Sequence, residues 1–222
     1  MTFGKRLTIR RLLAALLTLS VILPCRAAEP AWGLAQLMIE LGRVKQAKAT
    51  FVERKYLKVL SAPLESSGKL IYIAPYRLEK LTLDPKPESM VVDQDTLTLE
   101  ARGRKRSLQI QDYPVLWAFV ESIRGTLKGD LSALQQFYKV TLEGNRQEWQ
   151  IQLQPTDKKM AALIQAIHIR GSRDRLRGIE IFEADGDRSV MTVTDEPSLG
   201  AMDNFVCLAV KRMDTASQQC PA

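Results

Sequence analysis

The chain has 222 residues, of which 45% are hydrophobic and 26% are charged, and its formal net charge is +7. This is the composition of an ordinary globular protein, and it excludes a disordered chain, a collagen and a coiled coil. The positive charge at first favours a nucleic-acid-binding protein. However, five of the basic residues, with no acidic residue among them, lie within the first 27 residues.

Residues 1–27 are typical of a secretory signal peptide. Basic residues precede an apolar run over 12–23, which is too short to span a bilayer, and Pro24, Cys25 and Ala27 follow it. We therefore expect cleavage after Ala27 and an exported protein. Lipidation of Cys25 and an uncleaved anchor are the two alternatives. Cleavage lowers the formal charge to +2 over 195 residues, so we expect no nucleic-acid partner.

The first half of the exported chain predicts one helix followed by strands. Apolar residues at helical spacing predict a helix over 32–44. Alternating or β-branched segments then predict strands over 48–60, 66–74, 77–83, 88–93, 96–101 and 104–110. Pro75-Tyr76 and Gln94-Asp95 interrupt these segments and predict tight turns.

The period then changes to that of a helix. Residues 113–127 predict a helix with Pro114 in its first turn, and Asp130 predicts the N-cap of a second, shorter helix over 131–137. Strand patterns resume over 138–144, 147–154, 161–170, 177–184 and 188–194. The sequence therefore predicts an α+β domain over 28–196, built on an antiparallel meander, and a C-terminal tail over 197–222 that could add one strand.

The predicted strands have one apolar face each, and only two or three helices are available to cover that face. A curved sheet with few covering helices can form a container for an apolar ligand. A solid core of sheet and helices is the alternative, and the pattern of residues favours neither.

The sequence predicts no catalytic residue, metal site or cofactor. Its one histidine, His168, lies on the opposite face of a predicted strand from Ile167 and Ile169, which favours an exposed position. No motif for a nucleophile, a phosphate-binding loop or a zinc site accompanies it. Asp185-Gly186-Asp187 resembles a calcium loop only weakly and predicts a hairpin turn. An envelope hydrolase that uses His168 remains the enzymatic alternative.

Two further features leave alternatives open. Cys207 and Cys220 could form a disulfide in an oxidising compartment, or remain two free thiols. Basic clusters over 102–106 and 170–177 fall at predicted turns. Solvated hairpin ends explain them, and contact with an anionic membrane surface or an acidic partner is the alternative.

The order of motifs resembles a known family. A helix is followed by A-T-F-V-E (49–53), S-S-G-K-L-I-Y-I-A-P-Y-R-L (66–78) and V-V-D-Q-D-T-L (91–97). This order is similar to that of the periplasmic outer-membrane lipoprotein carriers, the LolA family, and most similar to its divergent branch. The resemblance implies an open, half-closed antiparallel β-barrel with helices covering an apolar cavity, as in LolA and LolB. It also implies a periplasmic location.

The resemblance further implies which residues face the cavity, with the helix over 113–127 as its lid. The implied cavity residues are Phe51, Leu70, Tyr72, Ala74, Leu78, Leu116, Phe119, Val120 and Ile123. Family members have an arginine before the proline, where it holds the lid, but this chain has Ala74 there and Arg77 beyond the proline. We therefore expect a different control of the lid.

The function implied is that of a monomeric carrier without a cofactor. It would shield the acyl chains of a lipoprotein or lipid-like cargo between an inner-membrane donor and an outer-membrane acceptor. An envelope sensor similar to RseB, which binds a partner protein without transporting cargo, is the alternative.

Overall fold

The computed structural model describes residues 32–196. The predicted signal peptide (1–27) and the tail (197–222), which includes Cys207 and Cys220, lie outside the described residues. Within the described part, no helix is both long and apolar enough to cross a membrane.

The strands form one antiparallel sheet of 11 strands in the order β6-β5-β4-β3-β2-β1-β11-β10-β9-β8-β7. Their bounds are β1 (Gln46–Tyr56), β2 (Leu64–Ile73), β3 (Arg77–Asp84), β4 (Glu88–Asp93), β5 (Thr96–Ala101), β6 (Arg104–Gln109), β7 (Tyr138–Gly144), β8 (Trp149–Pro155), β9 (Ile164–Ser172), β10 (Arg175–Glu183) and β11 (Arg188–Asp195). The edge strands β6 and β7 do not pair with each other, so the sheet stays open. The predicted open antiparallel fold is confirmed.

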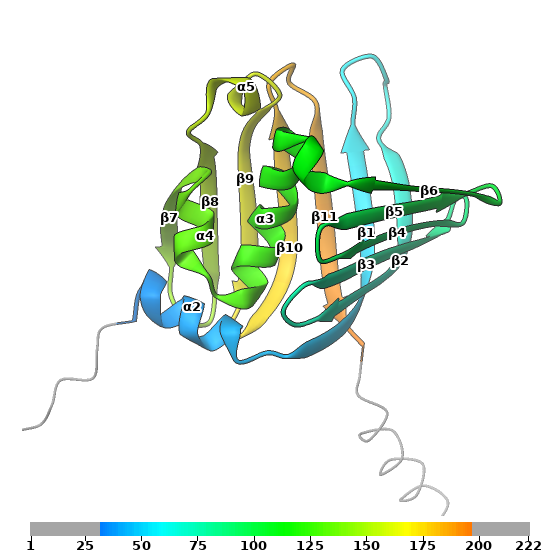
Figure 1. Cartoon of the computed structure of the whole chain (residues 1–222). Helices are drawn as coiled ribbons and strands as arrows, with labels where there is room; N and C mark the ends of the chain where they lie inside the picture. Colours follow the sequence, from blue (N-terminus) through cyan, green and yellow to red (C-terminus); the bar gives the residue numbers. More distant parts are fainter. Residues whose placement is uncertain (1–31, 197–222) are drawn as a thin grey trace, which may run out of the picture. The chain divides into compact units, whose positions relative to one another are not determined.

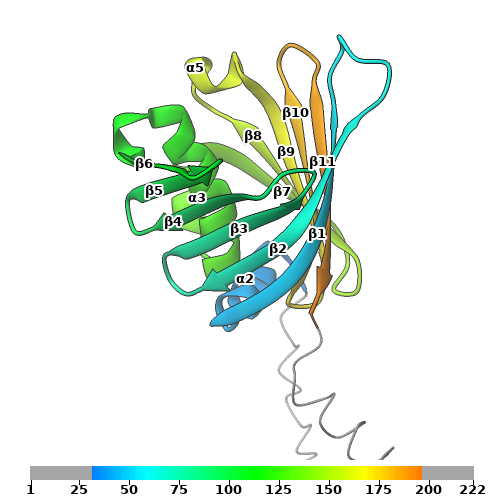
Figure 2. The same cartoon turned by 90° about the vertical axis from the view of Figure 1, so that its right-hand side faces the viewer.

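The sheet is strongly curved, and its two ends stand on either side of helix α3 (Figures 1 and 2). We call β2–β6 the N-terminal arm and β7–β10 the C-terminal arm; β1 and β11 join them through their pairing. The helices are α2 (Leu34–Gly42), α3 (Pro114–Lys128), α4 (Leu131–Gln135) and α5 (Lys158–Ala161), and a 3₁₀ turn covers Ile110–Asp112.

Local signals set the ends of the central helices. Pro114 occupies the first turn of α3, where its missing N–H costs nothing, and Asp130 caps α4 by accepting a hydrogen bond from the Ala133 N–H at 3.0 Å. Gly129 ends α3 with φ at +68°, and a Cβ atom there would collide with the Met38 carbonyl oxygen. Glycine therefore lets α3 end close against α2.

Two sequence predictions need correction. The strand predicted from residue 161 begins only at Ile164, because Asp157 accepts hydrogen bonds from two backbone N–H groups and caps the short helix α5. The basic cluster over 102–106 is not confined to a turn: Arg102 and Gly103 form the β5–β6 turn, while residues 104–106 belong to the edge strand β6. Exposed basic side chains on an edge strand discourage pairing with another sheet.

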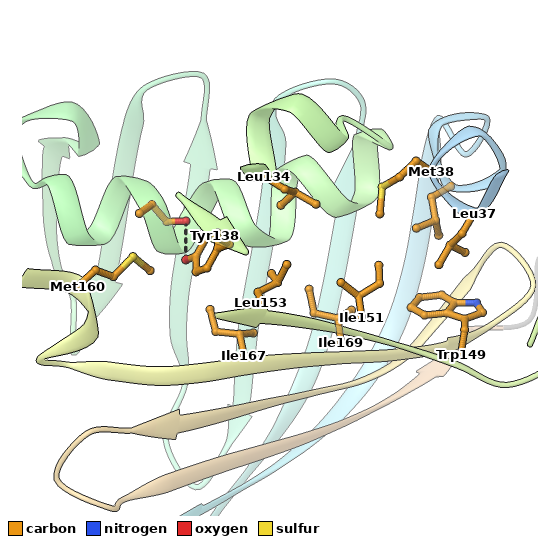
Figure 3. Packing of buried hydrophobic residues seen from close by; sticks show 12 residues of the cluster. Leu37, Met38, Leu134, Tyr138, Trp149, Ile151, Leu153, Met160, Ile167 and Ile169 are labelled. Carbon is orange, nitrogen blue, oxygen red and sulfur yellow. Dashed lines mark hydrogen bonds between the residues drawn. The ribbon is translucent and has the colours of Figure 1, made fainter. Parts of the chain in front are cut away.

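The main hydrophobic core lies between the C-terminal arm and helices α2, α3 and α4 (Figure 3). Ile151, Ile169 and Leu153 are fully buried there, as strict alternation along β8 and β9 requires. Two polar groups inside this core are satisfied: the Trp149 indole donates to the Arg173 carbonyl at 2.9 Å, and the Tyr138 hydroxyl donates to the Ala118 carbonyl at 3.0 Å.

A second, smaller cluster lies between α3 and the N-terminal arm. Val92 and Leu97 from β4 and β5 pack there with Ile110 and Val120. Helix α3 therefore contributes one face to each cluster and connects the two arms.

Candidate functional site

A cavity of about 380 Å³ lies between α3 and the concave face of the sheet. Its lining comes from both arms, from the joining strands β1 and β11, and from α2 and α3. Ala47, Ala49, Met90, Ile179, Met191 and Val193 are among the apolar lining residues. A volume of this size falls within the usual range of about 300–1,000 Å³ for ligand pockets.

Six of the nine residues predicted for the cavity are found in its lining: Leu70, Tyr72, Leu78, Phe119, Val120 and Ile123. The strand residues among them share one face because Leu70 lies two residues before Tyr72, which pairs with Leu78 on β3. The helix residues follow the helical spacing along α3. Strand and helix periodicity therefore bring these side chains together, and their contact with a ligand stays a prediction.

The other three predicted residues are not part of the cavity lining. Phe51 is only 2% exposed and packs beneath the Lys80 ammonium, 4.9 Å from its ring centre. Ala74 lies in the turn after β2, where its N–H donates to the Lys45 carbonyl at 2.8 Å. Leu116 packs against the second cluster.

The lining residues of β10 and β11 were not predicted from the sequence. Ile179 and Ile181 alternate along β10, and Met191 and Val193 alternate along β11. The alternation was visible in the sequence, but it does not show that β11 pairs with β1, far away in the chain. That pairing places these residues at the cavity.

Glu53, Lys80 and Ser189 form a polar group within the mostly apolar lining. The Glu53 carboxylate accepts hydrogen bonds from the Lys80 ammonium and from the Ser189 hydroxyl, the latter at 2.6 Å. Burial alone would raise the pKa of Glu53, but these two hydrogen bonds and the lysine charges outweigh it and hold that pKa below its ordinary value. Glu53 is therefore ionised at neutral pH.

Tyr72 is only 4% exposed, and burial raises the pKa of its hydroxyl, so the group stays protonated. Among the side chains of residues 32–196, its hydroxyl and the Trp32 indole N–H are the buried polar groups that lack a hydrogen-bond partner. Such groups are rare in native structures because each carries a desolvation cost.

Arg124 fastens α3 to the N-terminal arm. Its guanidinium, which is almost fully buried, donates to the Gln94 carbonyl in the β4–β5 turn at 2.6 Å and to the Glu121 carboxylate at 2.8 Å. Arg77 instead lies on the convex face of β3, where it pairs with Glu79 and Asp93. The helix itself therefore supplies the arginine that connects it to the sheet.

Two weaker candidate sites lie outside the cavity. His168 occupies the opposite face of β9 from the buried Ile167 and Ile169, but it is half-buried and not exposed as predicted, and its ring lies 4.8 Å from that of Phe182. The carboxylates of Glu183, Asp185 and Asp187 lie within 4.8 Å of one another at the β10–β11 turn. These acids already have protein partners, since two accept backbone hydrogen bonds and Glu183 pairs with a lysine.

Comparison with known proteins relates this fold to several solved structures, while no curated protein matches the sequence. The LolA superfamily protein of Nitrosomonas europaea is 9% identical, with 74% of this chain and 93% of that one covered and a TM-score of 0.38. The lipoprotein LppX of Mycobacterium tuberculosis is 10% identical, with 74% and 96% covered and a TM-score of 0.40. MucB of Pseudomonas aeruginosa, solved with MucA, is 15% identical, with 74% and 58% covered and a TM-score of 0.39.

The sequence profile of one family covers almost the entire domain. The family is described as "Outer membrane lipoprotein carrier protein LolA-like", and the match extends over residues 26–201, which include every described strand and helix. The chain therefore belongs to the outer membrane lipoprotein carrier protein LolA-like family.

Proposed function

We propose that this protein is a periplasmic carrier that shields the acyl chains of a lipoprotein or a lipid-like cargo between the inner and the outer membrane. The observation that carries the proposal is the apolar cavity between α3 and the two arms of the sheet. Membership of the LolA-like family supports it independently.

An acyl chain needs an apolar cavity because its exposure to water is costly. Each methylene group removed from water contributes about 0.8 kcal/mol, so an acyl chain does not cross an aqueous compartment unprotected. Side chains such as Leu70, Phe119 and Ile179 offer it an apolar environment. A carrier of this kind needs no catalytic group.

The location and the partners belong to the same proposal. The basic and apolar pattern over 1–27 supports export to the periplasm. A carrier between two membranes needs an inner-membrane donor and an outer-membrane acceptor, and we expect it to act as a monomer.

A pair of substitutions on one strand tests the cavity as the binding site. Leu70 and Ile73 both lie on β2, but Leu70 lines the cavity whereas Ile73 is 38% exposed and lies outside its lining. A carboxylate at position 70 would have to be desolvated by an acyl chain, which is costly. We expect Leu70→Asp to abolish binding of an acylated lipid, and Ile73→Asp to leave it unchanged.

The measurement is the binding of a fluorescent acyl lipid to each purified variant, with circular dichroism to show that both are folded. Equal binding by folded Leu70→Asp and Ile73→Asp would place the lipid elsewhere and contradict the proposal. Absence of lipid binding by the unaltered protein would favour a partner-binding sensor instead.

A further inference from the structure

The two edge strands of the open sheet differ in the charges that they present to a further strand. The strand β6 carries Arg104, Lys105 and Arg106 and no acidic residue, so two copies of it repel each other. The strand β7 carries one lysine and one glutamate, Lys139 and Glu143, and both side chains are exposed. The β7 edge therefore lacks the like charges that keep a second copy away from the β6 edge.

One side of β7 bonds to β8, and no described strand pairs with its other side (Figure 1). At one end of the pair, the Asn145 N–H donates to the Glu148 carbonyl at 2.8 Å. At the other end, the Thr156 N–H donates to the Phe137 carbonyl at 2.9 Å. Bonded and non-bonded positions alternate in an antiparallel pair, so the odd-numbered residues of β7 bond to β8. The even-numbered residues direct their N–H and C=O groups to the other side, where no hydrogen bond from residues 32–196 reaches them.

These free backbone groups suit a second copy of β7 in antiparallel orientation. When the two strands are centred on Thr141, Val140 lies opposite Leu142 of the second copy, and Tyr138 lies opposite Gly144. All four are even-numbered, so each opposite pair can exchange two backbone hydrogen bonds. This register therefore satisfies the free backbone groups of β7 along the entire strand.

The side chains favour the same register. Lys139 lies directly opposite Glu143 of the second copy, and the two-fold symmetry repeats this pair on the other side of Thr141. Neither residue has an ion-pair partner in the described part of its own chain. Opposite charges and paired threonines directly across two strands stabilise antiparallel pairing. The strand β7 is therefore complementary to itself in charge as well as in backbone hydrogen bonds.

We infer that two copies of this protein pair through β7 and form a two-fold symmetric dimer with one continuous sheet. The contact rests mainly on one strand of 7 residues, so we expect a weak dimer with a Kd of about 10 μM. This inference departs from the monomer expected of a carrier. It does not depend on the carrier function, because no residue of β7 lines the cavity.

The test is sedimentation velocity of the purified protein from about 1 to 200 μM, a range that brackets this Kd. Lys139→Glu places carboxylates opposite each other at both symmetric positions, and Glu143→Lys does the same with ammonium groups. We expect each substitution to raise the Kd at least about tenfold. The double variant Lys139→Glu/Glu143→Lys restores both opposite-charge pairs and should restore the Kd. Circular dichroism shows that the variants, altered only at exposed positions, are folded.

Mixing the two single variants separates this interface from any other. In a mixed dimer of Lys139→Glu with Glu143→Lys, every charge again lies opposite one of the other sign. The mixture should therefore dimerise at concentrations at which each variant alone is monomeric. Lys86→Glu is the control, because it changes the net charge equally at an exposed turn between β3 and β4. It should leave the Kd unchanged.

A cysteine cross-link tests the register. In a background of Cys207→Ser and Cys220→Ser, Thr141→Cys places two cysteines opposite each other with their Cα atoms about 4.5 Å apart, which permits a disulfide. Lys139→Cys is the control on the same strand, because its two copies would lie about 13 Å apart. We expect mild oxidation to produce a covalent dimer of Thr141→Cys and none of Lys139→Cys.

Two results would overturn the inference. A protein that stays monomeric at about 200 μM has no such interface. A dimer that neither charge reversal weakens, or that the double variant does not restore, pairs elsewhere. Neither result bears on the carrier function, which the lipid-binding measurement tests separately.

Discussion

The two arms of the sheet have the same alternating pattern but are covered very differently. On the C-terminal arm, inward residues such as Ile151 and Ile169 are fully buried under α2, α3 and α4. On the N-terminal arm, Leu70 and Leu78 are only partly buried, and Met90 is 41% exposed. Strand pattern alone therefore does not decide between a core and a cavity. The number of helices available to cover each arm decides it.

The largest expected effect comes from truncating equivalent side chains on the two arms. Ile169→Ala should lower the free energy of unfolding by about 4 kcal/mol, because it leaves a cavity in a close-packed core. Leu70→Ala should cost about 1 kcal/mol, because the removed atoms faced an existing cavity and had few contacts to lose. Urea denaturation of both variants measures the difference, and equal losses would show that the arms are equally packed.

The contact between α3 and the N-terminal arm gives the next effect. Arg124→Met removes the hydrogen bond to the Gln94 carbonyl and leaves the buried Glu121 carboxylate without its partner. We expect this to lower the free energy of unfolding by about 3 kcal/mol. Hydrogen exchange should also become faster in the β4–β5 turn than in β8 or β9, since the substitution loosens one arm only.

Arg77→Met is the control, because Arg77 also bonds Asp93 near that turn but is only partly buried, on the convex face. An equally large loss of stability in Arg77→Met would indicate that ion pairs on the convex face, and not the contact with α3, stabilise the N-terminal arm.

The smallest expected effect is a pH dependence of stability that arises from Glu53 in the cavity lining. The pKa of Glu53 is lowered in the folded protein, so its contribution to stability is present above the ordinary value of 4.5 and is lost as the pH falls through the folded-state pKa. Between about pH 6 and pH 3, Glu53→Gln should therefore lose less stability than the unaltered protein. Urea denaturation midpoints of both proteins across this pH range measure the difference. Midpoints that fall in parallel would contradict a stabilising role of the ionised Glu53.

Local patterns predicted most of the fold. Helical spacing in α2 and α3, the cap at Asp130 and the alternation in β8 are properties of a few neighbouring residues, and the structure confirms them. The helix α5 was missed because it is one turn long and rests on the cap at Asp157. Its apolar residues run directly into those of β9, so periodicity does not separate the two.

The polar contacts of the candidate site could not be predicted in the same way. Ser189 reaches Glu53 across 136 residues of sequence, and Arg124 reaches Gln94 across 30. These contacts exist because β11 pairs with β1 and α3 crosses the sheet. No local sequence motif predicts either arrangement. Leu70 and Phe119 were predicted because the resemblance to LolA carriers supplied the register that the residues alone do not show.

Native mass spectrometry of the protein purified from the periplasm tests the central claim most directly. The cavity account predicts a bound acylated species at a fixed ratio to the protein, and lipid extraction would identify its class. A protein that carries no such species, and takes none up when it is incubated with acylated lipids, would contradict the account.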